Sequence, residues 1–124
     1  MSNKIAHLEL ATTDKAASAK FYADLLGWPI ETVQPMDYTM TMFPPGETTM
    51  GLSPVNEEFG VTPGSVLVYV DVTDIDAFIA RAKELGAPIF VDKMEIEGIG
   101  WMAIVGDPGG NRMGAMQRVE PPSE

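Results

Sequence analysis

Residues 5–14 read Ile-Ala-His-Leu-Glu-Leu-Ala-Thr-Thr-Asp, and residues 66–74 read Val-Leu-Val-Tyr-Val-Asp-Val-Thr-Asp. In both stretches apolar side chains alternate with polar or aromatic ones, a pattern typical of a strand with one buried face. Both stretches end in Thr-Asp, and either side chain can cap a following helix by accepting a free backbone N–H. The same strand-to-helix passage therefore occurs twice in this chain.

A helix and three further strands are predicted after each passage. Each predicted helix has an apolar stripe and is followed by a glycine that can adopt the left-handed conformation. The stripe and glycine are Ala17, Phe21, Leu25 and Gly27 in the first half, and Ile75, Phe78, Ile79, Ala82, Leu85 and Gly86 in the second. The predicted strands are 28–33, 38–43 and 48–53, then 88–92, 101–105 and 112–119.

The two halves can be superimposed as one repeated unit. Asp14 matches Asp74, Tyr38 matches Trp101, and Gly51 matches Gly114. Because a helix must bury its stripe on one face of its sheet, we expect an α+β fold. Two βαβββ modules would form a curved mixed β-sheet cup with a helix packed outside each module. We expect one domain over 1–119, with module one at 1–54, a linker at 55–64 and module two at 65–119, followed by a flexible tail at 120–124.

The composition excludes several classes of function. The 124 residues carry a net charge of −10, which disfavours nucleic acid and an anionic membrane surface as partners. The absence of cysteine excludes disulfides, thiolate metal sites and a cysteine nucleophile. We see neither a secretory signal nor an apolar run long enough to span a membrane, so we expect a cytoplasmic protein.

Several motifs together resemble those of the glyoxalase/bleomycin-resistance/dioxygenase superfamily, also called vicinal oxygen chelate (VOC). They are Asp14-x-x-Ala17-x-x-x-Phe21-Tyr22-x-x-x-Leu26-Gly27-Trp28, Gly51, Tyr69-Val70-Asp71-Val72-Thr73-Asp74, Ala82-Lys83-Glu84-Leu85-Gly86-Ala87 and Asp107-Pro108-x-Gly110-Asn111. The resemblance covers Ile5 to Gln117. It implies paired βαβββ modules forming a cup, and it also implies a homodimer.

The resemblance also implies a metal site, but this sequence lacks most of the residues that would bind the metal. Metal-dependent members hold one divalent ion on a His or Glu of the first strand and a Glu of the last strand of each module. Here those four positions are His7, Leu67, Gly51 and Gly114. One imidazole is too few, because a catalytic metal needs about three protein ligands. We therefore predict no metal and no cofactor, as in the metal-free branch of the superfamily.

The candidate site residues lie on the predicted inner face of the cup. His7 and Glu9 are the candidate catalytic residues, since His is the commonest general base near neutral pH. A structural role for this lone histidine is the alternative. The predicted ligand-binding residues, for which plain packing is the other interpretation, are His7, Glu9, Tyr38, Gly51, Leu67, Tyr69, Trp101 and Gly114.

Three functions remain open at this point. The first is metal-independent binding of an unidentified small molecule in the cup, with or without a slow isomerase- or lyase-type step through His7. The second is a metal-dependent enzyme of glyoxalase or dioxygenase type, which would need further ligands. The third is a non-catalytic interaction module, because a fold does not fix a function.

Overall fold

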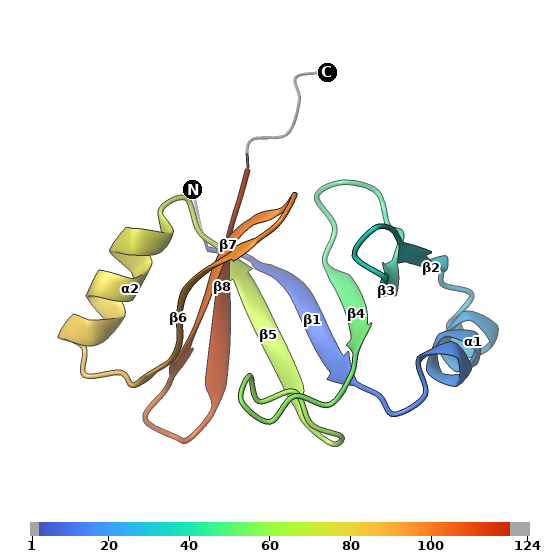
Figure 1. Cartoon of the computed structure of the whole chain (residues 1–124), viewed down its shortest axis with the longest axis horizontal. Coiled ribbons are helices and arrows are strands. Elements are labelled where there is room, and N and C mark those ends of the chain that lie inside the picture. Colours follow the sequence, from blue (N-terminus) through green and yellow to red (C-terminus); the bar gives the residue numbers. More distant parts are fainter. Residues whose placement is uncertain (1–2, 120–124) are drawn as a thin grey trace. The chain divides into compact units, whose positions relative to one another are not determined.

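The computed structural model describes residues 3–119 (Figure 1). This part of the chain divides into two compact units. Residues 6–67 form one unit, and residues 68–119 with residues 3–5 form the other. The names module one and module two are kept below for the first and the second βαβββ set of elements. The expected tail at 120–124 lies outside the described residues.

Module one contains one helix and a four-stranded mixed sheet. In chain order its elements are β1 (Ile5–Ala11), α1 (Lys15–Leu26), β2 (Ile30–Val33), β3 (Tyr38–Thr41) and β4 (Thr49–Ser53). The strand order is β2-β3-β4-β1, with β1 parallel to β4 and the other neighbours antiparallel. The parallel pairing places β4, the last strand of the module, directly beside β1, the first.

Module two repeats this topology. Its elements are β5 (Val66–Asp71), α2 (Ile75–Glu84), β6 (Ile89–Ile96), β7 (Gly100–Gly106) and β8 (Arg112–Arg118). The order is β5-β8-β7-β6, and β5 runs parallel to β8. The α+β class with two βαβββ modules is thus confirmed.

Both helices begin as the sequence predicts. The carboxylate of Asp14 accepts a hydrogen bond from the backbone N–H of Ala17, and that of Asp74 accepts one from Ala77, each at 3.0 Å. Gly27 follows α1 with a φ of +72°, the left-handed conformation expected of a glycine there. The repeated Thr-Asp passage therefore has the same local structure in both modules.

The core of module two lies between α2 and its sheet. Ile75 and Ile79 of α2 are buried against Ala103 of β7 and Ala115 of β8. Phe78 and Ala82 belong to the same inward side, as predicted. The prediction was wrong for Leu85, which is 69% exposed because the helix ends at this residue and its side chain no longer faces the sheet.

Helix α1 faces its sheet differently from the prediction. The predicted buried stripe of Ala17, Phe21 and Leu25 is exposed, with 56% exposure for Phe21 and 63% for Leu25, and no residue of α1 is buried. The half-buried side is the adjacent one, with Ala19, Tyr22 and Ala23. Both sides of this alanine-rich helix are apolar, so spacing alone did not identify the inward one.

The strand register corrects one equivalence between the modules. Met40 pairs with Gly51, and Ile104 pairs with Gly114. Tyr38, two residues before Met40, therefore corresponds to Met102 and not to Trp101. Side chains alternate between the two faces of a sheet, so this one-residue shift places Trp101 on the α2 side.

The connection between the modules has no helix or strand of its own, but it is anchored. Asn56 and Val61 exchange two backbone hydrogen bonds, of 2.8 and 2.9 Å. The Val61 side chain is buried. Among residues 3–119, no helix is long and apolar enough to cross a membrane.

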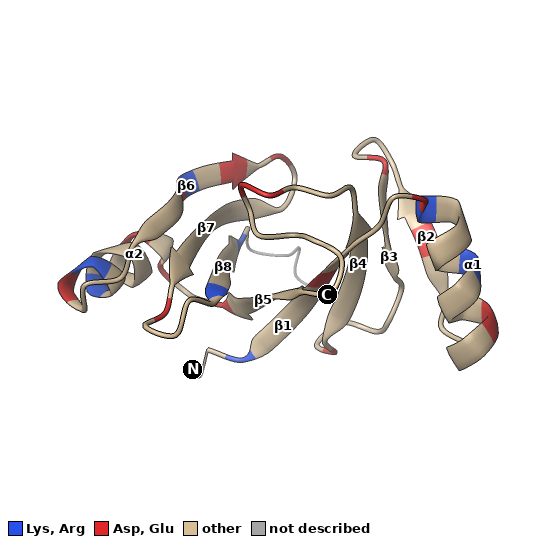
Figure 2. Ribbon diagram, turned by 90° about the horizontal axis from the view of Figure 1, so that it is seen from below, with Lys and Arg blue, Asp and Glu red and all other residues tan. Residues whose placement is uncertain are grey.

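Charged residues of both signs are interspersed along α1 and α2, as the blue and red parts of the ribbon show (Figure 2). Lys20 pairs with Asp24 at 2.6 Å on α1, and Arg81 pairs with Glu84 at 2.9 Å on α2. These exposed pairs contribute little to stability. The Asp24 carboxylate raises the pKa of the Lys20 ammonium through a hydrogen bond and through charge attraction.

Candidate functional site

Three neighbouring strands of module one bring polar side chains to one face of its sheet. His7 and Glu9 of β1 lie beside Thr49 and Gly51 of β4, respectively, in the parallel register. Alternation adds Ser53 of β4 to this face, whereas Ala6, Met50 and Leu52 are buried on the other. His7 and Glu9 are only 6% and 7% exposed, so both ionisable groups are buried.

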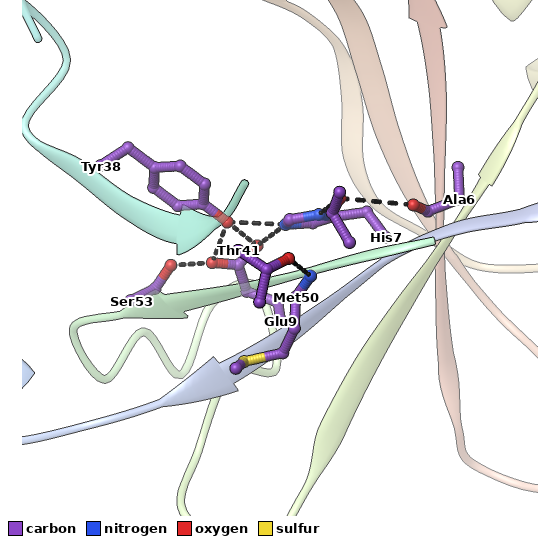
Figure 3. A network of polar contacts seen from close by, with 8 residues as sticks. Ala6, His7, Glu9, Tyr38, Thr41, Met50 and Ser53 are labelled. Atoms are coloured by element: carbon purple, nitrogen blue, oxygen red, sulfur yellow. Dashed lines mark hydrogen bonds and ion pairs between the residues drawn. The ribbon is translucent and has the colours of Figure 1, made fainter. Parts of the chain in front are cut away.

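Hydrogen bonds join these side chains into one cluster (Figure 3). The Tyr38 hydroxyl, from β3, lies 2.7 Å from His7 Nε2 and 2.7 Å from each carboxylate oxygen of Glu9. His7 Nε2 is also 3.1 Å from Glu9 Oε1. Ser53 donates a hydrogen bond to Glu9 Oε2, and Thr49 Oγ1 is 2.6 Å from His7 Nδ1. We call His7, Glu9, Tyr38, Thr49 and Ser53 the polar cluster.

One assignment of protons satisfies every group of the polar cluster. The Tyr38 hydroxyl donates to the Glu9 carboxylate and accepts from His7 Nε2–H, while the Thr49 hydroxyl donates to His7 Nδ1. With a second proton on the imidazole, Nδ1–H donates to Thr49 Oγ1, which turns its own proton to the carbonyl of Ala6 at 3.5 Å. The Thr49 hydroxyl can thus act as donor or as acceptor toward His7 Nδ1.

Gly51 leaves the space that the Tyr38 hydroxyl occupies. A Cβ atom built on Gly51 would lie 1.7 Å from Tyr38 Oη and 2.9 Å from His7 Nε2. Real Cβ atoms do not approach other atoms so closely, so a side chain at position 51 and the tyrosine hydroxyl exclude each other. The sequence predicted Gly51 as a ligand-binding residue, with plain packing as the alternative, and the structure places the Tyr38 hydroxyl beside it.

The sequence matches the family described as the Glyoxalase/Bleomycin resistance protein/Dioxygenase superfamily over residues 4–114. The chain belongs to this superfamily. Its curated relative DauV, an anthracycline biosynthesis protein of a Streptomyces species, is 29% identical over 136 residues, which cover 93% of this chain and 49% of DauV. The VOC chain thus spans about half the length of the curated relatives that it matches.

Solved structures show the same VOC fold. The protein BH1468 from Bacillus halodurans aligns with a TM-score of 0.72 at 19% identity, over 100% of both chains. Methylmalonyl-CoA epimerase from Mycobacterium tuberculosis aligns with a TM-score of 0.71 at 16% identity, over 94% of this chain and 88% of that one. At such identities the likeness concerns the fold alone.

The metal ion implied by the superfamily does not fit the residues of module one. A carboxylate from β4 would have to start at Gly51, where the Tyr38 hydroxyl already lies. That leaves His7 and Glu9, and both are engaged by hydrogen bonds within the polar cluster. Within residues 3–119, no three His, Cys, Asp or Glu side chains are grouped so that they could hold an ion.

The equivalent face of module two is packed with apolar groups. Tyr69 lies beside Gly114 in the parallel register, as Glu9 lies beside Gly51. A Cβ on Gly114 would lie 2.6 Å from Tyr69 Cδ2, so the ring covers this glycine. Tyr69 and Leu67 are buried, with 5% and 1% exposure. Their ligand-binding role stays a prediction.

Trp101 packs against the α2 core, on the face of the module-two sheet away from Gly114. The Lys93 ammonium lies 4.6 Å from the centre of its ring. This placement favours a structural role for the indole.

The structure brings together two groups of the predicted site residues. Module one contains His7, Glu9, Tyr38 and Gly51, and module two contains Tyr69 and Gly114.

Sequence reasoning missed Thr49 and Ser53 as members of the polar cluster. Their positions two residues on either side of Gly51 place them on the same strand face. This signal was available once Gly51 had been assigned to the inner face.

A pocket of about 260 Å³ lies beside the start of α2 and is lined by Val72, Asp74, Phe78 and Arg81 among others. It contains none of the predicted site residues.

Proposed function

We propose that this VOC protein binds a small organic molecule at the polar cluster of module one and does so without a metal ion. The observation that carries the proposal is the Tyr38 hydroxyl, which lies 2.7 Å from both His7 Nε2 and the Glu9 carboxylate in the space beside Gly51. The face of the sheet that carries the polar cluster therefore presents hydrogen-bonding groups and not a set of metal ligands.

The energetics of the polar cluster support a functional role. Burying an imidazole and a carboxylate removes their hydration, a cost that apolar residues at positions 7 and 9 would avoid. Five polar groups from three strands satisfy one another there. Sequences depart from such local rules of core composition mainly at functional sites.

The chemistry of the polar cluster suits a ligand that carries hydroxyl or carbonyl groups. A ligand hydroxyl or ammonium could donate to the Glu9 carboxylate, and a ligand carbonyl could accept from the Tyr38 hydroxyl or from His7. Two relatives suggest probes for a screen. The name of DauV points to anthracyclines, and the epimerase structure to methylmalonyl-CoA.

Thermal unfolding in the presence of candidate ligands tests this proposal. Protein treated with EDTA would be screened against an anthracycline, methylmalonyl-CoA and small aromatic and dicarbonyl compounds. We expect at least one compound to raise the Tm, because a ligand that binds only the native state stabilises it. Glu9→Gln should abolish that rise, whereas the matched control Glu31→Gln, exposed on β2, should retain it.

Two outcomes would contradict the proposal. One is stabilisation by a compound only when a divalent ion is added. The other is stabilisation that survives both Glu9→Gln and His7→Ala, which would place the ligand away from the polar cluster.

We also propose that the protein is a cytoplasmic homodimer. The exposed apolar residues of α1, Phe21, Leu25 and Leu26, support an association through this helix. Size-exclusion chromatography with light scattering should give twice the mass of the chain. A monomer across the accessible range of concentrations would contradict the proposed dimer.

A further inference from the structure

Three atoms of the polar cluster form a compact triangle held by hydrogen bonds. The separations are 3.1 Å between His7 Nε2 and Glu9 Oε1, and 2.7 Å from Tyr38 Oη to each of these two atoms. Donor atoms arranged tetrahedrally around a Zn²⁺ ion at ~2.0–2.2 Å lie about 3.3–3.6 Å apart, so these hydrogen-bonded atoms would have to separate by a few tenths of an ångström to share one. The strand β1 thus holds an imidazole and a carboxylate within a small adjustment of ligand spacing.

The Tyr38 hydroxyl fills the third corner of this triangle as a neutral group. It donates to the Glu9 carboxylate and accepts from the imidazole. A cation at this place would have to displace that phenol proton and both hydrogen bonds. The hydroxyl thus satisfies the two buried groups that would otherwise attract an ion.

A carboxylate side chain introduced at position 51 would occupy the place of the Tyr38 hydroxyl. A Cβ there would lie 1.7 Å from Tyr38 Oη and 2.9 Å from His7 Nε2, so a side chain on this residue starts where the phenol ends. The phenol and a side chain at position 51 are alternatives for one volume. Changing both residues would exchange a hydrogen-bonding group for a metal ligand.

We propose that Tyr38 determines the specificity of this site by excluding divalent cations, and that Tyr38→Ala combined with Gly51→Glu creates a cation site with His7 and Glu9. The combined change supplies three protein ligands, the number that a zinc site with an open position requires. This inference does not depend on the identity of any organic ligand. Failure of the ligand screen would leave it standing.

The test is calorimetric titration with Zn²⁺ after dialysis against EDTA. The proteins are the natural chain, Tyr38→Ala, the double variant Tyr38→Ala/Gly51→Glu, and the double variant with His7→Ala added. We expect about one Zn²⁺ per chain in the double variant only, with binding at least about 100-fold weaker in the other three. The variant lacking His7 separates this site from nonspecific binding to a chain of net charge −10.

Two results would overturn the proposal. The first is one tightly bound Zn²⁺ in the natural chain that His7→Ala removes, because Tyr38 would then not exclude the ion. The second is a double variant with native circular dichroism that binds no better than Tyr38→Ala. If the double variant does not fold, Tyr38→Ala/Gly51→Asp, with its shorter side chain, replaces it and should also bind about one Zn²⁺ per chain. The titration of the natural chain can give the first result in either case.

Discussion

The Tyr38 hydroxyl and Gly51 depend on each other, because the phenol oxygen lies 1.7 Å from the point that a Cβ at position 51 would occupy. The two residues come from adjacent strands, β3 and β4. The hydroxyl also links His7 to Glu9. The missing side chain at position 51 and the phenol at position 38 are thus parts of a single packing arrangement.

Gly51→Ala should destabilise the protein by about 1–3 kcal/mol, as overpacking of a filled interior does. The cost should fall when Tyr38→Ala is already present, because the two closest atoms, both of the Tyr38 side chain, have then been removed and only the approach to His7 Nε2 at 2.9 Å remains. Urea unfolding of the four proteins of this double-mutant cycle measures the coupling. Gly109→Ala is the control, since a Cβ there would meet its nearest neighbours at 3.5 Å. Additive effects of the two substitutions would contradict the arrangement.

Gly114→Ala should destabilise at least as much as Gly51→Ala. A Cβ at position 114 would lie 2.6 Å from Tyr69 Cδ2 and 3.0 Å from Cγ, so it meets the base of the ring. The tip of Tyr38 can swing aside, but the Tyr69 ring is buried, so turning it about the Cα–Cβ bond would displace close-packed neighbours. Urea unfolding again measures the free energy, and a clearly smaller loss for Gly114→Ala would count against this packing.

The two helices should respond differently to truncation of an apolar residue. Ile79→Ala in α2 should cost about 2–5 kcal/mol, as the loss of a buried side chain does. Phe21→Ser in α1 should change the stability of the monomer by no more than ~0.5 kcal/mol, the usual range for exposed positions. Unfolding at a concentration that gives monomer compares them. A large loss for Phe21→Ser would show that this stripe is buried.

This asymmetry also shows what the sequence could and could not predict. Alternation in β1 and β5 and the Asp caps predicted the repeated modules, because those signals are local. The inward side of α1 was not predictable, since Phe21 and Leu25 on one side and Ala19, Tyr22 and Ala23 on another are all apolar. The contact of Tyr38 with His7, 31 residues away in sequence, depends on the register between strands. A one-residue error in that register paired Tyr38 with Trp101.

Asp107 should stabilise the turn before β8 at neutral pH. Hydrogen bonds from the backbone and side chain of Asn111, and from the backbone of Gly109, hold the pKa of its carboxyl below the ordinary value of 3.8. A lowered pKa means that the folded state favours the ionised form. The stabilisation is therefore complete above the unfolded-state pKa and is lost as the pH falls through the folded-state pKa.

Asp107→Ala tests this dependence. Its urea midpoint should lie below that of the natural chain at neutral pH, and the difference should shrink at about pH 2. Glu97→Ala, at an exposed position of the loop between β6 and β7, is the control and should show little difference at either pH. A difference for Asp107→Ala that is constant with pH would mean that the ionised carboxylate is not the stabilising group.

The metal content of the natural protein, measured by elemental analysis after purification without chelators, tests the central claim most directly. With Tyr38 hydrogen-bonded between His7 and Glu9, we predict far less than one divalent ion per chain, and the same low value in His7→Ala. About one ion per chain in the natural protein that is lost in His7→Ala would contradict the account.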